Sequence, residues 1–298
     1  MSLNYRENRI NKIVKYWSMK KETDLIAYYK IQNSQFEKLK RSIKLYVCAA
    51  MNINYSDDDK KFLVNVDNSR LNLLNITPNG GVVPKKEFQL EYNLFLREWC
   101  NLMKIITRKK PNLISNFRIT PNIRIKFGKE IDANKNRELN TSYPHSDAWL
   151  DGPWGMNCFL PIAGDTQNNN LLYYDPIKFE EKFLSRAKTY KEMQWVLSYY
   201  KALTKFKPKP GNIYISDYGV IHQTYRKKNA KTRISLDTTL IVGNHKPYTF
   251  RKNEYKSKIP NYGIDEFVKS NKFENDKVQD KKNFFSHYTK ALTENIKL

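Results

Sequence analysis

The chain has 298 residues, of which 40% are hydrophobic and 28% charged, so it can bury a sizeable core in one large domain or in a domain with an appendage. Its 20 Tyr, 15 Phe and 5 Trp argue against a disordered chain. The net charge of +23 would suit nucleic acid, a membrane surface or an anionic ligand. The lysines are spread along the whole chain, however, without an Arg-rich run, a zinc-finger spacing or interleaved basic and aromatic residues, so nucleic acid is not the expected partner.

The cysteines and the apolar segments bear on where the protein works. Cys48, Cys100 and Cys158 are odd in number and far apart, which excludes a disulfide framework and a CxxC metal site. The first 20 residues lack the apolar stretch of a signal peptide, and no apolar run approaches the roughly 18 residues of a membrane span. We therefore expect a cytoplasmic protein that does not enter a membrane, and the sequence does not indicate its oligomeric state.

The spacing of apolar residues predicts the elements in chain order. Helices are expected in residues 1–50 and 86–107, a short strand at 62–66, and a loop at 78–81. From about residue 117 the pattern becomes strand-like, with segments at 117–127, 143–150, 155–162, 171–174, 212–215, 220–225 and 233–242. One helical insertion, at 178–206, interrupts these strands.

This order predicts an α+β fold, in which a sheet closed into a barrel or sandwich carries helices on one face. We expect the whole chain, 1–298, to form a single domain. Its parts would be a helical support (1–115), a barrel core (116–245) and a C-terminal extension (246–298).

Histidine is scarce, with only four in the chain, and one of them lies beside a carboxylate. His145 and Asp147 are two residues apart in a strand-like segment, so their side chains should share a face while Ser146 points away. A third ligand is available from His222 in a later strand-like segment. Two His and one carboxylate on one side of a metal leave the other side open, as in non-haem Fe(II) oxygenases, whereas the HExxH motif of hydrolytic zinc sites is absent.

The last predicted strand alternates between polar and apolar residues. Arg233, Ser235, Asp237 and Thr239 fall on one face, and an inward polar face in a barrel needs something polar to bind. An Arg beside a hydroxyl suits a carboxylate, because the guanidinium offers paired donors and the hydroxyl adds another.

Together, His145-x-Asp147, His222 and Arg233-x-Ser235 resemble the signature of the Fe(II)/2-oxoglutarate-dependent oxygenases, with the strongest likeness to the phytanoyl-CoA-hydroxylase-like and antibiotic-biosynthesis branches. The resemblance covers about residues 117–242 and implies a double-stranded β-helix, a jelly-roll or cupin-like barrel. It implies that His145, Asp147 and His222 bind Fe(II) and form the catalytic centre. Arg233 and Ser235 would then hold the distal carboxylate of 2-oxoglutarate.

The resemblance also implies the reaction, in which O2 and 2-oxoglutarate are consumed while a C–H bond of a small molecule is hydroxylated or otherwise oxidised. A natural-product-like or anionic substrate would fit the branch and the charge. Asn157 is a further candidate for contact with the co-substrate, or else satisfies backbone groups. The insertion would be a helix packed on the barrel, a lid over the site, or both. The alternative from a different class is a basic binding protein on a barrel scaffold, with a structural or vestigial metal site.

Overall fold

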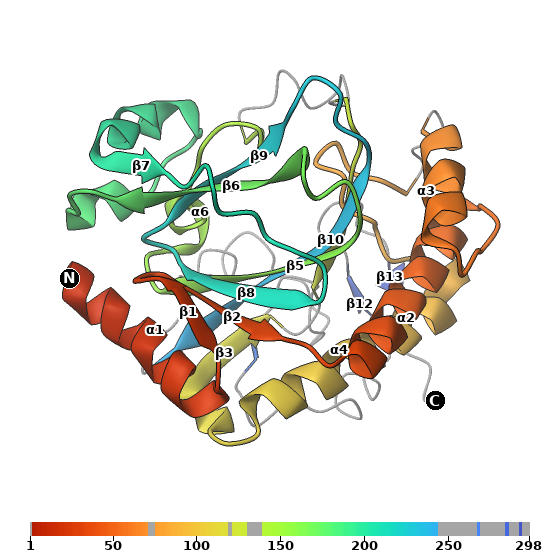
Figure 1. Cartoon of the computed structure of the whole chain (residues 1–298), viewed down its shortest axis with the longest axis horizontal. Helices are drawn as coiled ribbons and strands as arrows, with labels where there is room; N and C mark the ends of the chain where they lie inside the picture. The colour runs from red at the N-terminus through yellow and green to blue at the C-terminus, as the bar shows by residue number, and fades with distance from the viewer. Residues whose placement is uncertain are drawn as a thin grey trace.

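The computed structural model describes residues 2–70, 75–118, 121–129 and 139–243, together with three two-residue strands at 267–268, 284–285 and 292–293. Two antiparallel sheets form the centre, and helices from the N-terminal part of the chain surround one side of it (Figure 1). Most of the expected C-terminal extension, together with His245 and His287, lies outside the described residues.

The helices expected near the N-terminus are present. They are α1 (Leu3–Trp17), α2 (Asn33–Met51), α3 (Asp59–Asn68) and α4 (Gln89–Thr107). α2 and α4 pack through an aromatic cluster in which the ring of Tyr46 lies 5.2 Å from that of Tyr92 and 5.9 Å from that of Phe95. This packing joins the helices to the same apolar core as the larger sheet.

Two local expectations in this region were wrong. The stretch 62–66 is part of α3 rather than a strand, because Asp58 caps the helix by accepting from the backbone N–H of Lys61 at 2.8 Å, and Phe62 and Val66 share its buried face. A hairpin of β1 (Lys20–Thr23) and β2 (Ile26–Lys30) interrupts the expected helical region. β2 joins the larger sheet as a neighbour of β8.

The larger sheet has the order β1-β2-β8-β5-β10-β3-β11, with β4 also paired to β10. Its further strands are β3 (Ile114–Arg118), β4 (Asn122–Lys126), β5 (Gly155–Gly164), β8 (Asn212–Asp217), β10 (Arg233–Val242) and β11 (Phe267–Val268). Side chains alternate across it, so Leu160 and Leu236 enter the helix-covered core while Asn157 and Arg233 line a cavity on the opposite face.

The smaller sheet has the order β7-β6-β9, and its strands are β6 (Asn169–Pro176), β7 (Tyr200–Ala202) and β9 (Ile221–Arg226). Residues 141–145 run along its β9 edge. The backbones of His145 and His222 exchange two 2.9 Å hydrogen bonds there, and Thr224 donates to the carbonyl of Thr141 at 2.8 Å. In the view of Figure 1 the smaller sheet lies above the larger one. Within the described ranges no strand pairing joins them, so they are two facing sheets rather than one closed barrel.

The short connecting elements differ from the expected ones. They are η1 (Lys86–Phe88), η2 (Pro111–Leu113), α6 (Ala148–Asp151), η3 (Glu181–Leu184) and η4 (Lys191–Tyr199). The predicted strand 143–150 is absent, because His145 forms one isolated bridge and the chain then turns into α6. The insertion is helical, as expected, and its two 3₁₀ helices pack around their own apolar cluster with Trp149. Two further strands, β12 (Phe284–Phe285) and β13 (Leu292–Thr293), pair with each other.

The loop expected at 78–81 connects the bridged residues Ile76 and Val82. Gly80 has φ +79°, and a Cβ at this position would lie 2.1 Å from the carbonyl oxygen of Ile125 in β4. Only glycine fits so close an approach, which places the neighbouring Asn79 at the wall of the cavity.

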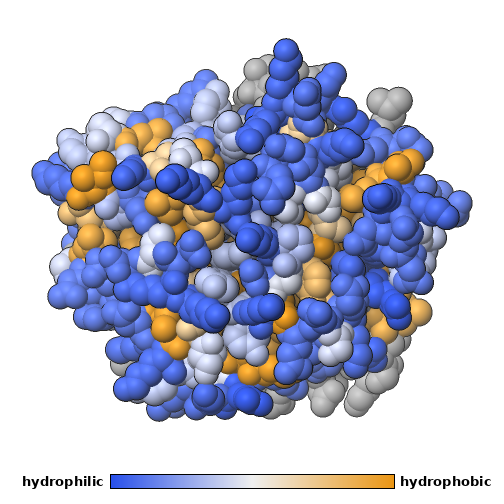
Figure 2. Space-filling view, in the orientation of Figure 1, coloured by the Kyte–Doolittle hydropathy of each residue, from blue (hydrophilic) through white to orange (hydrophobic). Residues whose placement is uncertain are grey.

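The surface on the face drawn in Figure 2 is mostly hydrophilic, and its apolar residues form small separate patches. Among the described helices, none has the length and apolar composition needed to cross a membrane.

Candidate functional site

His145 is held in a defined orientation by its own segment and by the insertion. Its Nδ1 lies 2.8 Å from the carbonyl oxygen of Tyr143, so Nδ1 carries the proton and Nε2 keeps its lone pair. The ring of Tyr190 stacks on the imidazole with the centroids 4.3 Å apart. The Nε2 atom is therefore presented to the cavity as a ready ligand.

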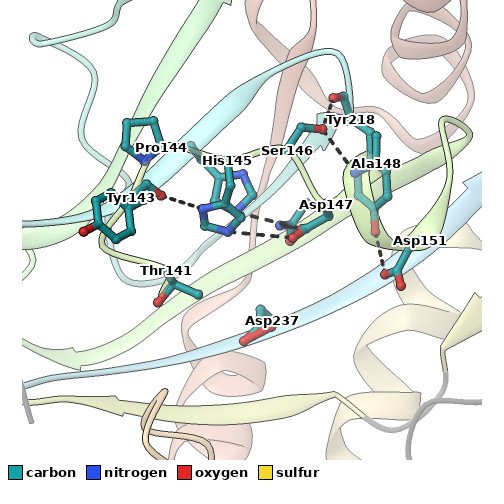
Figure 3. A network of polar contacts seen from close by, with 12 residues as sticks. Thr141, Tyr143, Pro144, His145, Ser146, Asp147, Ala148, Asp151, Tyr218 and Asp237 are labelled. Carbon is teal, nitrogen blue, oxygen red and sulfur yellow. Dashed lines mark hydrogen bonds and ion pairs between the residues drawn. The ribbon is translucent and has the colours of Figure 1, made fainter. Parts of the chain in front are cut away.

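Asp147 reaches the same place although the predicted strand ends before it. The carboxylate Oδ1 lies 3.9 Å from His145 Nε2, and Oδ2 lies 3.9 Å from His222 Nε2. Ser146 points away, as predicted, and its hydroxyl donates to the carbonyl of Tyr218 at 2.6 Å (Figure 3). The turn into α6, rather than strand alternation, brings the carboxylate back towards the histidines.

These three side chains converge. Their ligand atoms all lie within 4.8 Å of one another, and both imidazoles are buried. His145 and His222 come from neighbouring chain segments of the smaller sheet, with ring centroids 4.4 Å apart. Two nitrogen donors and one carboxylate at these separations can hold a metal ion and leave positions on its far side open.

Burial dominates the electrostatics of the three groups. It lowers the pKa of His145 to about 3 and that of His222 to about 4, so both rings are neutral near pH 7 and keep their lone pairs. Burial raises the pKa of the Asp147 carboxyl to about 6, with the charge of Asp151 adding to the effect. A bound dication would supply the counter-charge that this carboxylate lacks.

A cavity of about 230 Å³ lies beside these ligands, between the two sheets. The smaller sheet contributes His222 and Thr224 to its wall, and the larger sheet contributes β4, β5 and β10. All of the polar residues predicted on the inward face of β10 line it, namely Arg233, Ser235, Asp237 and Thr239. Figure 3 shows Asp237 on a strand that lies opposite His145 and Asp147.

Arg233 is fully buried and incompletely paired. Its Nη1 donates to Oδ1 of Asn170 at 3.2 Å, its guanidinium lies 5.2 Å from the centroid of the Phe159 ring, and its Nε has no hydrogen-bond partner among the described residues. Burial lowers its pKa to about 9, which leaves it charged near pH 7. A buried guanidinium with an unused donor at a cavity wall is a binding group for an anion.

Lys126 is the site residue that sequence reasoning missed. It is the cross-strand neighbour of Arg233 in the β4–β10 pair and lines the same cavity, with Nζ 3.0 Å from the Thr141 hydroxyl. No described carboxylate forms an ion pair with it. Burial and the nearby arginines lower its pKa well below the usual value. The sequence of β4 could have indicated this residue, because Asn122, Arg124 and Lys126 alternate with apolar residues and so share one face of the strand.

Arg124 and Asp237 form an ion pair across β4 and β10. The guanidinium donates from Nε and Nη2 to the two carboxylate oxygens, at 2.5 and 3.1 Å, and Asn122 adds a third donor at 3.3 Å. Both charged side chains are about one-fifth exposed, so the pair stands at the more open part of the cavity.

Asn157 also lines the cavity, and its amide donates to Oδ2 of Asp147 at 2.8 Å. From the sequence, Asn157 was expected to contact either a co-substrate or backbone groups. The contact found is with a candidate metal ligand instead, and a further contact with a co-substrate stays a prediction.

Hydrogen bonds join the insertion to the segment that carries His145 and Asp147. Gln194 Nε2 donates to the carbonyl of Pro144 at 2.8 Å, and the Trp149 indole donates to the carbonyl of Phe183 at 2.8 Å. The backbone N–H of Ala187 donates to the carbonyl of Trp149 at 3.2 Å. Together with the stacking of Tyr190 on His145, these contacts hold this segment in place against the insertion.

No protein-family model matches the chain, and no curated protein matches it. Among solved structures, the chain is similar to the non-haem α-ketoglutarate-dependent carbocyclase SnoK from nogalamycin biosynthesis, with 6% identity over 82% of this chain and 89% of that one and a TM-score of 0.43. AviO1 from Streptomyces viridochromogenes Tue57 is 10% identical over 80% of this chain and 96% of that one, with a TM-score of 0.43. An N-substituted L-amino acid dioxygenase from Burkholderia ambifaria AMMD is 12% identical over 78% and 87%, with a TM-score of 0.38. A likeness at these TM-scores is too slight to assign a function, which has to come from the residues of this chain.

Proposed function

We propose that this protein is an Fe(II)- and 2-oxoglutarate-dependent oxygenase that oxidises a C–H bond of a small molecule. The observation that carries the proposal is a pair of features on one cavity. His145, Asp147 and His222 converge at its wall, and the buried guanidinium of Arg233 meets the same cavity with an unpartnered Nε. A small molecule that chelates the metal and also has a distal anionic group would bind to the metal site and to Arg233 at the same time.

The proposal includes a double-stranded β-helix as the core. Support comes from the path of the chain between the two sheets. It passes from β4 in the larger sheet to residues 141–145 beside the smaller one, returns in β5, forms β6 and β7 in the smaller sheet, and then alternates through β8, β9 and β10. Seven strands and one bridged segment wound between two facing sheets in this way have the path of a jelly roll. The candidate ligands lie on the second and seventh of these segments or directly after them.

The donor set fits iron. Two neutral imidazoles and one carboxylate on one side of a metal are typical of non-haem Fe(II) oxygenase sites. Bound iron would supply the activation of O2 and couple the conversion of 2-oxoglutarate into succinate and CO2 to oxidation of the substrate. The residues of the chain would hold the ion, and the hydrogen bond from His145 Nδ1 would keep the ligating nitrogen free of a proton.

The cationic part of the cavity fits the distal carboxylate of 2-oxoglutarate. Arg233 would offer its free Nε, Ser235 lies two residues along the same face, and Lys126 brings a second buried cation from the neighbouring strand. A buried guanidinium and a buried amine without a described carboxylate partner are costly to keep charged in the empty protein, and an anion placed between them would stabilise their charged forms.

We do not favour the basic binding protein as a second candidate. A structural or vestigial metal site would explain the three ligands. It would give no reason to keep two buried cations directed at the same cavity.

The proposal is tested by turnover without a primary substrate. Purified protein is mixed anaerobically with Fe(II) and 2-oxoglutarate, its visible spectrum is recorded, O2 is admitted and succinate is measured. A weak charge-transfer band followed by slow succinate formation is expected, and both should be missing with the Asp147→Ala variant. If iron binds but neither signal is seen, the co-substrate assignment is wrong.

A further inference from the structure

The carboxylate of Asp147 is not fixed by the backbone that carries it. The segment has one bridge to the smaller sheet, at His145, and Asp147 then begins the four-residue helix α6 in a helical conformation. Its side chain makes no capping hydrogen bond to that helix. A side chain at such a turn would rotate freely about its own bonds unless another element held it.

The element that holds it belongs to the opposite sheet. Asn157 donates from Nδ2 to Asp147 Oδ2 at 2.8 Å and is only 8% exposed. It stands in β5, in register with Ser216 of β8 on one side and Thr239 of β10 on the other. A residue flanked by paired strands on both sides has little freedom to move, so it can locate the carboxylate accurately.

The hydrogen bond distinguishes the two carboxylate oxygens. Each oxygen lies 3.9 Å from the Nε2 atom of one histidine, Oδ1 from His145 and Oδ2 from His222, but the amide of Asn157 donates to Oδ2. A carboxylate with one oxygen held by a donor binds a metal more readily through the other alone. With both oxygens free, it could take two positions on the ion and reduce the number left open.

We propose that Asn157 is a positioning residue that limits Asp147 to one metal contact and so keeps open the positions that a chelating co-substrate needs. The inference rests on the proposed metal site, and it assigns Asn157 a role that acts through Asp147 rather than through direct contact with the co-substrate.

The test measures binding in the absence of turnover, with Mn(II) in place of iron. The concentration of free Mn(II) is measured by electron paramagnetic resonance for the wild type and for Asn157→Leu. Leucine has a side chain of similar size to that of asparagine but has no hydrogen-bond donor. Loss of a hydrogen bond to a metal ligand typically weakens metal affinity by about 10- to 100-fold, and we expect a loss in that range. Ser216→Ala is the matched control, because Ser216 neighbours Asn157 in the sheet but is not among the described residues that line the cavity.

A second readout separates positioning from a merely structural role. At saturating Mn(II), binding of 2-oxoglutarate and of 2-oxopentanoate, which has a methyl group in place of the distal carboxylate, is followed by calorimetry. If Asp147 takes a second position on the metal in Asn157→Leu, both keto acids should bind more weakly by the same factor, while the melting temperature of the metal-free protein stays near that of the wild type.

Unchanged Mn(II) affinity together with unchanged keto-acid affinity in the folded variant would overturn the role of Asn157 while leaving the proposed function intact. Wild-type protein that binds no Mn(II) would overturn both. If Asn157→Leu does not fold, Asn157→Ala removes the same donor without adding volume, and the same outcomes decide.

Discussion

Replacement of Arg233 by Met separates the contribution of this residue to ligand binding from its contribution to stability. Methionine keeps an unbranched side chain of moderate length in the buried position but removes the charge and all the donors. The wild-type guanidinium has one side-chain hydrogen bond, to Asn170 Oδ1, and an unpartnered Nε. The partner Asn170 Oδ1 also accepts from the backbone N–H of Leu171 at 2.9 Å, so it stays satisfied in the variant.

The two expected effects have different sizes. Truncating one partner of a buried, hydrogen-bonded charge pair costs about 2–5 kcal/mol, which corresponds to about a 30- to 5,000-fold loss of affinity for 2-oxoglutarate. The metal-free protein should lose little or gain stability, because a buried cation beside Lys126, without a carboxylate partner, gives way to an apolar side chain. A residue that mainly supported the fold would show the reverse pattern.

The assay compares two keto acids on Mn(II)-loaded protein. Arg233→Met should weaken binding of 2-oxoglutarate and leave 2-oxopentanoate nearly unaffected, since only the first has a distal carboxylate. Thermal melting of the metal-free protein supplies the stability. Equal losses for both keto acids, or a large fall in melting temperature with unchanged binding, would refute the assignment of Arg233 as the carboxylate anchor.

Three further variants test other parts of the site. Asp147→Ala should abolish succinate formation while the circular dichroism spectrum stays that of the wild type, and full activity would exclude the proposed metal centre. Lys126→Met should raise the melting temperature of the metal-free protein, because a buried amine whose charged form is disfavoured by burial is replaced by an apolar side chain. It should weaken 2-oxoglutarate binding by about tenfold or more, and unchanged binding would limit Lys126 to a structural role. Gln194→Ala should speed hydrogen exchange in residues 143–151 and lower Mn(II) affinity, whereas Lys188→Ala, on the exposed side of the insertion, should change neither.

The parts of the site that the sequence predicted depend on short-range patterns. Histidine is scarce, so a His two residues before an Asp was conspicuous, and period-2 alternation placed Arg233, Ser235 and Asp237 on one face. The structure brings His145, Asp147 and His222 together, although the strand assumed for Asp147 does not exist. Their role as metal ligands stays a prediction.

The parts that were missed depend on which strands become neighbours. Lys126 was missed because its place opposite Arg233 comes from the pairing of β4 with β10. Asn157 was a predicted site residue, but its contact with Asp147 was missed because it depends on β5 facing the turn at Asp147. Neither relation follows from spacing within one segment. Residues 62–66 were assigned to a strand because a short apolar run does not distinguish a strand from a buried helix, and the cap at Asp58 decided the outcome. The single domain and the cytoplasmic location stay predictions.

The charges around the cavity explain why the +23 of the chain says little about the substrate. Among the described lining residues the cations are Arg124, Lys126 and Arg233, and the carboxylates are Asp147, Asp151 and Asp237, so their formal charges cancel. They are distributed unevenly, because Lys126 and Arg233 are cross-strand neighbours, Arg124 is paired with Asp237, and Asp147 is a ligand of the proposed metal site. A dication at the carboxylate end and a dianion reaching to the cations complement this distribution and again cancel each other. With both bound as proposed, the cavity would have no formal charge left to neutralise, and we expect its electrostatics to favour a substrate whose reacting end is uncharged.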